Sequence, residues 1–165
     1  KQQDSESKEK EVKLKEEEKE KRIEQKQLAK ERIPVIAKSL LECKQGTITI
    51  DNITMELAGS GKANFCYSTS DNYDDVFHIG LGEALCKADP KLVYCGLFEQ
   101  GEKIRAIVYA GEDISKEKSA GEIVKRISQI LGGAGGGSPK FAQGGGIDKS
   151  KKEDAIKNAK SMIIE

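Results

Sequence analysis

The glycine-rich stretch at residues 132–146 constrains this chain more than any other feature of its sequence. It reads GGAGGGSPKFAQGGG, and eight of its fifteen residues are glycine. Ordering glycine costs more backbone entropy than ordering any other residue, so a folded chain uses it where φ is positive or where another group approaches the backbone closely. A disordered linker is the alternative. Because a linker does not need Pro139, Lys140, Phe141 and Gln143 among its glycines, the sequence predicts an ordered loop inside a domain.

This glycine loop carries groups that suit nucleic acid. Free backbone N–H groups beside a lysine fit a phosphate backbone or a base edge. Phe141 either stacks on an unpaired base or anchors the loop in the core, Gln143 offers an amide, and Pro139 sets the turn. The candidate binding residues of the loop are Gly132, Gly133, Gly135, Gly136, Gly137, Ser138, Pro139, Lys140, Phe141, Gln143, Gly144, Gly145 and Gly146.

Residues 46–165 predict a small globular α/β domain around this loop. Alternating or continuous apolar runs predict strands at 47–50, 53–57, 63–68, 92–98 and 104–110. Helical periodicity predicts one helix over about 70–88, and capping boxes at Ser119 and Ser150 open two more. Gly132 is expected to end the helix that starts near Ser119. The order β, α, β, β, α, glycine loop, α indicates a mixed sheet covered by helices.

The lysines around the start of the last helix suggest a local anion site. If the loop joins two helix ends, the positive N-terminus of the last helix points at whatever the loop holds. Lys149, Lys151 and Lys152 crowd that end in the sequence, where they otherwise form an ordinary solvated helix start. Together with Lys140 they predict one basic site on a chain whose formal net charge is zero.

Residues 1–45 predict a separate helical subdomain. Lys, Glu, Gln and Arg dominate residues 1–33, and several Glu-to-cation pairs stand at the favourable i,i+4 spacing. Pro34 is expected to break the helix, so that a second, apolar helix follows and the two form a hairpin. The apolar side of that second helix comprises Val35, Ile36, Leu40 and Leu41. The sparse apolar residues before it keep no clean heptad, so either a solvated helix or an arm that pairs with a second copy fits the pattern.

The composition argues against a metal centre and a membrane span. The four cysteines, Cys43, Cys66, Cys86 and Cys95, form no CxxC pair, and the chain has one histidine, His78. We therefore expect reduced, mostly buried thiols, a cytoplasmic protein and a structural or surface histidine. No apolar run is long enough to cross a membrane. The chain starts with Lys1 rather than methionine, which suggests a fragment of a longer protein.

The glycine stretch resembles the glycine-rich motif in the C-terminal domain of alanyl-tRNA synthetases. That domain, called C-Ala, is related to the DHH-associated domain of DHH-family phosphoesterases. The chain departs from the motif at Ser138, where the family usually has arginine, and at Lys140, where it usually has an acid. The matching residues are Gly132, Gly133, Gly135, Gly136, Gly137, Pro139, Phe141, Ala142, Gln143, Gly144 and Gly145.

The resemblance implies a non-catalytic module of an alanine–tRNA ligase. Its glycine loop would rest on the outer corner of alanine-accepting tRNA, where the D and T loops meet, and so assist aminoacylation and editing. Its helical subdomain, including Val35, Ile36, Leu40 and Leu41, would join two subunits into a homodimer. The resemblance implies no cofactor in these residues; ATP, magnesium and zinc would belong to other domains of the parent enzyme.

Three alternatives remain open from the sequence. In the first, the chain is the nucleic-acid-binding domain of a DHH-type phosphoesterase, although the glycine motif of those enzymes usually ends in histidine where this chain has Ile147. In the second, the chain is the C-terminal domain of a free-standing alanyl-tRNA editing protein, which carries the same domain. The third alternative is a pure dimerisation adaptor in which residues 1–45 are the working part.

Overall fold

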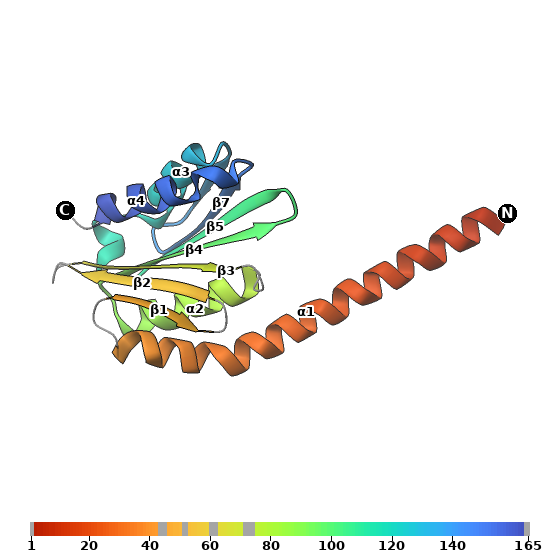
Figure 1. Ribbon diagram of the computed structural model, residues 1–165, viewed down its shortest axis with the longest axis horizontal. Helices are drawn as coiled ribbons and strands as arrows, with labels where there is room; N and C mark the ends of the chain where they lie inside the picture. Colours follow the sequence, from red (N-terminus) through yellow and green to blue (C-terminus); the bar gives the residue numbers. More distant parts are fainter. Residues whose placement is uncertain (1, 43–45, 51–52, 60–62, 71–74, 164–165) are drawn as a thin grey trace.

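The protein is a seven-stranded sheet between two layers of helices, with one long helix extending from it (Figure 1). The computed structural model describes residues 2–42, 46–50, 53–59, 63–70 and 75–163. In chain order the elements are α1 (Gln2–Glu42), β1 (Gly46–Ile50), β2 (Ile53–Gly59), β3 (Asn64–Ser70), α2 (Asp75–Ala88), β4 (Leu92–Gln100), β5 (Lys103–Ala110), a 3-10 turn (Ile114–Lys116), α3 (Ala120–Ile130), β6 (Ala134–Gly137), β7 (Phe141–Gly146), a second 3-10 turn (Lys149–Lys151) and α4 (Lys152–Ile163).

The strand order across the sheet is β1-β2-β3-β4-β5-β7-β6. Only β3 and β4 run parallel, and α2 is the crossover that parallel neighbours require. All other described pairs are antiparallel, including β4 with β5 and β5 with β7. The expected α/β class with a mixed sheet is confirmed, as are the strands and helices from residue 46 to the glycine stretch.

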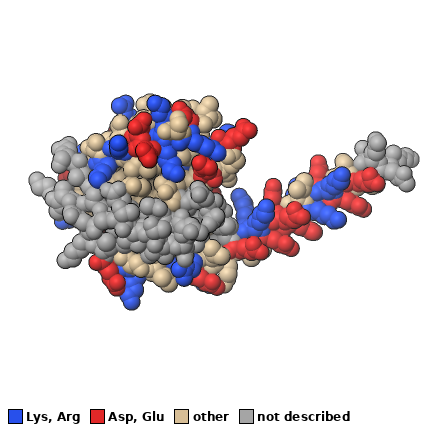
Figure 2. Space-filling model, in the orientation of Figure 1, with Lys and Arg blue, Asp and Glu red and all other residues tan. Residues whose placement is uncertain are grey.

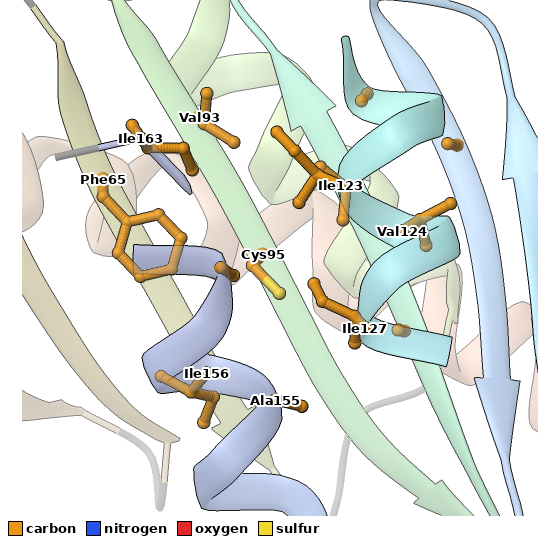
Figure 3. Packing of buried hydrophobic residues seen from close by; sticks show 14 of the residues in the cluster. Phe65, Val93, Cys95, Ile123, Val124, Ile127, Ala155, Ile156 and Ile163 are labelled. Carbon is orange, nitrogen blue, oxygen red and sulfur yellow. The ribbon is translucent and has the colours of Figure 1, made fainter. Parts of the chain in front are cut away.

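Alternation along the strands sends side chains into two cores, one on each face of the sheet. The larger core lies under α3 and α4, where Phe65 and Cys95 from the sheet meet Ile123, Ile127 and Ile156 from the helices (Figure 3). The smaller core lies under α2 and the C-terminal end of α1, and contains Leu81, Leu85 and Tyr94. The two faces of β5 therefore serve different partners: Ile104, Ala106, Val108 and Ala110 face α3, whereas Arg105, Ile107 and Tyr109 lie on the side of α2.

Helix α1 corrects the expected helical hairpin. The helix runs unbroken from Gln2 to Glu42 with Pro34 inside it (Figure 1). A proline inside a helix costs about 3 kcal/mol because it removes one backbone hydrogen bond and crowds the preceding turn. Burial of Ile36 and Ala37 against α2 offsets this cost, since both side chains are almost fully removed from solvent. Tertiary packing has thus overridden a local breaker that the sequence alone suggested.

Most of α1 is a charged arm. Lysine and glutamate side chains of both signs are interspersed along it (Figure 2), and its large apolar side chains Val12, Leu14, Ile23 and Leu28 are exposed. The arm meets the globular part from Ile33 onward, where the Ile33 side chain approaches Gly80 of α2. Among the described helices, α1 included, none has the length and hydropathy needed to span a membrane.

Candidate nucleic-acid interface

The glycine-rich stretch is a β-hairpin, not a loop between two helix ends. Strands β6 and β7 form the exposed end of the sheet, with Ala134 opposite Gly145 and Gly136 opposite Gln143. Strand β7 also pairs with β5, which ties the hairpin to the centre of the sheet. The sequence missed these strands because glycine has the lowest strand propensity of the residues found there, and hydrogen bonding to β5 supplies the order instead.

The turn of the hairpin, at Ser138–Lys140, is fixed from two directions. Within it, the Ser138 N–H donates to the Phe141 carbonyl over 2.8 Å, and the Ser138 hydroxyl accepts from the Phe141 N–H over 3.1 Å. From α3, the Ala120 N–H donates to the Pro139 carbonyl and the Gly121 N–H to the Ser138 carbonyl. The N-terminus of α3 is therefore occupied by the chain's own carbonyls, and Ser138 acts as a turn residue.

Helix α3 lies directly on one face of the hairpin. Ser128 is fully buried there, and its hydroxyl accepts a hydrogen bond from the Gly145 N–H over 3.1 Å. A Cβ atom at Gly135 or Gly144 would lie 2.6 or 2.2 Å from the Ser128 hydroxyl oxygen. These two glycines therefore have a packing role inside the protein, and the α3 side of the hairpin is closed to a ligand.

Two further glycines shape the base of the hairpin. Gly132 has φ +78° and ends α3, as its place in the sequence predicted. Gly146 lies so close to α3 that a Cβ atom would sit 2.1 Å from the Leu131 carbonyl oxygen. That close approach lets the Leu131 carbonyl accept hydrogen bonds from both Ile147 and Asp148 N–H groups.

The opposite face of the hairpin, on the side of α2, is partly open. Helix α2 lies over β4 and β5, and the side chains of Phe141 and Gln143 remain partly exposed beside it. Residues paired across antiparallel strands share a face, so this face consists of three rows. From one end of the strands to the other, the rows are Arg105 with Gly145 and Ala134, Ile107 with Gln143 and Gly136, and Tyr109 with Phe141. In the middle row Ile107 is fully buried, and only its partners on β7 and β6 are accessible.

A basic pocket lies over the first of these rows. It has a volume of about 390 Å³, because Gly145 and Ala134 place little or no side chain there. Arg105 and Lys103 supply positive charge, and the Arg105 guanidinium donates to the Gln143 amide oxygen over 3.2 Å. None of the described residues that line the pocket carries a carboxylate. The charge of its lining therefore favours an anion.

An aromatic pair occupies the third row. The rings of Tyr109 and Phe141 have centroids 5.1 Å apart and planes tilted by 48°. Phe141 is therefore not a deeply buried anchor: it is partly exposed and rests on Tyr109, which itself packs at the edge of the smaller core beside Gly82 of α2. Partly exposed rings on a sheet face are surfaces on which bases stack in RNA-binding modules.

The expected convergence of lysines is wrong. Lys140 lies beside Ala110, at one end of β5, whereas Lys149 donates to the Gly101 carbonyl at the other end. The length of β5 separates them, about 24 Å for eight residues in extended conformation. Two of the three lysines near α4 already have acidic neighbours: Lys149 pairs with Glu99 at 3.5 Å, and Lys151 lies 4.0 Å from Asp154. Lys152 is the first residue of α4 itself.

The N-terminal end of α4 is not an open anion site either. The carboxylate of Asp148 accepts a hydrogen bond from the Ser150 N–H over 3.1 Å, at the start of the turn that leads into α4. A negative charge of the chain itself therefore already occupies the position that an anionic ligand would take. The structure brings together the hairpin residues but not Lys140 with Lys149, Lys151 and Lys152.

Sequence reasoning missed three residues of the open face: Lys103, Arg105 and Tyr109. Alternation in β5 places Arg105 and Tyr109 on one side of a strand that was correctly predicted. The missing information was the pairing of β5 with β7, since only that pairing brings Arg105 to Gln143 and Tyr109 to Phe141. No signal local to either strand shows it.

Of the predicted dimerisation residues, Ile36 is not available to a second copy. Its side chain is fully buried in the smaller core. Val35 next to it is 47% exposed. The side chains of Leu40 and Leu41 lie outside the described part of the structure.

His78 belongs to a buried polar cluster instead of a catalytic site. Its Nδ1 lies 2.8 Å from the Tyr94 hydroxyl and 3.2 Å from the Ser68 hydroxyl, and all three side chains are fully buried. Burial lowers the pKa of His78 to about 3, so the ring is neutral at physiological pH. Its plane also stacks on Phe98, with centroids 5.0 Å apart. These contacts make it a structural histidine of the smaller core.

The described cysteines are buried and unreactive. Burial raises the pKa values of Cys86 and Cys95 to about 12 and that of Cys66 further still, so thiolates are scarce at neutral pH. All three are free thiols; Cys43 lies outside the described residues. Within the described ranges, His, Cys, Asp and Glu side chains form no group of three that would hold a metal ion.

The fold and this interface define a three-layer α/β module with a glycine-rich hairpin at one end of its sheet. The chain belongs to the DHHA1 domain family, which matches residues 62–165. It is 44% identical over 166 residues to an alanine–tRNA ligase of Nitrosopumilus maritimus, an alignment that covers 99% of this chain and 18% of that protein. An alanine–tRNA ligase of Cenarchaeum symbiosum is 41% identical over 92 residues, which cover 56% of this chain and 10% of the ligase.

A solved structure agrees with these relatives. The C-Ala domain of the alanyl-tRNA synthetase from Aquifex aeolicus superposes with a TM-score of 0.61 at 25% identity, over 65% of this chain and 96% of that domain. The resemblance to C-Ala domains is thereby confirmed. The chain spans less than a fifth of the length of the two ligases it matches.

Proposed function

We propose that this chain is a tRNA-binding and subunit-joining module of an alanine–tRNA ligase. The observation that carries the proposal is the similarity of almost the whole chain to one such ligase, together with its C-Ala fold. The glycine-rich hairpin supports it, since bare backbone and a basic pocket suit recognition of RNA by shape and phosphate contacts. The ligase names of the relatives favour this reading over a DHH-type phosphoesterase or a free-standing editing protein.

The module would hold the outer corner of alanine-accepting tRNA while other domains of the ligase aminoacylate and edit its acceptor end. The candidate contacts are the hairpin residues 132–146, with Lys140 at the exposed turn. ATP, magnesium and zinc would be bound by domains outside this chain. We place the ligase in the cytoplasm, where the three buried free thiols would stay reduced.

The direct test compares two RNA ligands. The chain is expected to bind alanine-accepting tRNA more tightly than a hairpin that retains the acceptor stem but lacks the D and T loops. Fluorescence anisotropy with each labelled RNA, at two salt concentrations, gives both affinities. Equal, weak binding to both ligands would contradict the tRNA-corner proposal and leave the adaptor alternative.

Replacement of Lys140 by alanine is expected to weaken tRNA binding and to lower the slope of log affinity against log salt. Lys140 is exposed at the hairpin turn, where one phosphate contact would contribute a slope of about 0.7–0.9. Titration of tRNA at several salt concentrations measures the slope. Lys125→Ala is the matched control, because Lys125 is exposed on α3, on the far side of the sheet. An unchanged slope in Lys140→Ala would exclude a phosphate contact at this position.

The charged arm supports the subunit-joining part of the proposal. Its exposed Val12, Leu14, Ile23 and Leu28 have little to contact within the globular part, which meets α1 only from Ile33 onward. A second copy would cover such side chains. We therefore propose a homodimer joined through the arms.

Removal of residues 1–29 is expected to abolish dimerisation without loss of stability. This cut leaves Ile33, Ile36 and Ala37 on α2, so the free energy of unfolding should change by no more than about 0.5 kcal/mol. Analytical ultracentrifugation gives the mass and chemical denaturation gives the stability. By contrast, removal of residues 1–42 should also destabilise the fold by at least about 2 kcal/mol, because it uncovers the smaller core. A shortened chain that remains dimeric would exclude the arm as the joining element.

A further inference from the structure

We infer that the open face of the hairpin binds an unpaired stretch of RNA laid along the strands, with its backbone at Arg105 and a base on Tyr109 and Phe141. The inference rests on the proposed function and adds to it the face, the substrate class and the residues. Helix α3 closes the other face of the hairpin through Ser128, so the side of α2 is the one left for a ligand.

The two ends of this face differ in charge. Arg105 and Lys103 are the cations of the pocket at one end, where no described lining residue is acidic. At the other end, the pKa of the Tyr109 hydroxyl is raised. Burial is the larger cause, and the nearby carboxylate of Glu83 on α2 is the second. A phosphate is therefore favoured in the pocket beside Arg105, whereas the rings suit the uncharged face of a base. Lys140, next to Phe141 at the exposed turn, offers a contact to the RNA backbone that continues past the rings.

The spacing of the two ends fits a short run of nucleotides. Arg105 and Tyr109 are four residues apart on one strand, about 13 Å in extended conformation. Sheet surfaces of RNA-binding modules stack two or three bases, and they take them from loops because a paired base is not free to stack. The pocket volume of about 390 Å³ also falls within the range of small-molecule sites, which is about 300–1,000 Å³. The geometry thus favours a looped, single-stranded segment over a duplex.

Gly136 offers a way to block this face without disturbing the fold. It lies opposite Gln143, in the row between the basic pocket and the aromatic pair. A Cβ atom built on Gly136 meets nothing within 4 Å, unlike one on Gly135 or Gly137. A side chain at this position therefore enters the space where the RNA would lie and leaves the packing of the hairpin unchanged.

The test measures RNA binding by substituted forms of the full chain and locates the RNA by cross-linking. Gly136→Glu and Phe141→Leu are each expected to weaken binding of alanine-accepting tRNA and of a short unpaired oligonucleotide by about 5- to 100-fold. Gln129→Glu, which adds the same charge at an exposed position of α3, is expected to change affinity less than about 2-fold. Phe141→Tyr, which retains the ring, should bind as tightly as the unaltered chain.

Two further measurements complete the test. Ultraviolet cross-linking and mass spectrometry should locate the RNA at Tyr109 or Phe141, and equal melting temperatures should show that each variant is folded.

Three contrary results would each contradict a different part of the inference. If Gly136→Glu and Phe141→Leu bind tRNA normally while Lys140→Ala binds weakly, the hairpin binds tRNA but not on this face. If a duplex of the same sequence binds as tightly as the single strand, the unpaired-strand inference fails. If the unaltered chain binds no tRNA, the proposed function and this inference fail together.

Discussion

Replacement of Gly146 by alanine is expected to lower the free energy of unfolding by about 2–4 kcal/mol, a large effect for one methyl group. The added Cβ atom would lie 2.1 Å from the Leu131 carbonyl oxygen and 2.8 Å from the Leu131 Cβ. Neither group is the end of a flexible side chain. The backbones of α3 and β7 must therefore separate, and the two hydrogen bonds that Ile147 and Asp148 donate to Leu131 must lengthen.

Gly136→Ala provides the matched control within the same motif. Its methyl group would meet no atom within 4 Å, so the stability should change by no more than about 0.5 kcal/mol. Urea denaturation of the two variants and the unaltered chain measures both effects. Similar losses in the two variants would show that general backbone flexibility of the hairpin, and not contact with α3, sets the cost.

Acidification is expected to destabilise the protein through His78. The pKa of this side chain is about 3 in the folded protein and about 6.5 in an unfolded chain, so the unfolded state binds more protons between these values. The stability contributed by the neutral ring is therefore present above pH 6.5 and falls as the pH drops towards 3. The loss approaches about 1.4 kcal/mol per pH unit and totals about 3–5 kcal/mol.

Comparison with His78→Gln isolates this contribution. Both proteins share the same carboxylates, so their acid titration is common to both curves, and the difference in slope below pH 6.5 reports His78. Denaturation at several pH values should show a flatter curve for His78→Gln, whereas Ser68→Ala, which retains the buried ring, should keep the steep one. Parallel curves for the unaltered chain and His78→Gln would contradict the burial of a neutral histidine.

Periodicity predicted the central elements because each has enough apolar side chains to show its pattern. Strands β4 and β5 and helix α3 fall where their apolar residues placed them, and Gly132 ends α3 as expected. Their side chains fill the larger core, so pattern and burial coincide. The assignment of three cysteines as buried thiols followed from the same apolar surroundings.

The hairpin and α1 escaped sequence reasoning for the opposite reason, since contacts distant in sequence decide both. Glycines in β6 and β7 show no periodicity, and their order comes from pairing with β5 and from Ser128 beneath them. Pro34 is a local breaker, but Ile36 and Ala37 are held by α2. The separation of Lys140 from Lys149 likewise depends on the strand that lies between them.

The anchoring of α1 at only one end makes the helix a lever. From Ile33 back to Gln2 it extends about 48 Å beyond its contact with α2, at 1.5 Å per residue. A tilt of about 10° at the anchor displaces the far end by about 8 Å over that length. Pro34, which lacks an N–H group, lies directly at this fulcrum. Small repacking of Ile36 against α2 would therefore be amplified into a large change in position for anything that the arm holds.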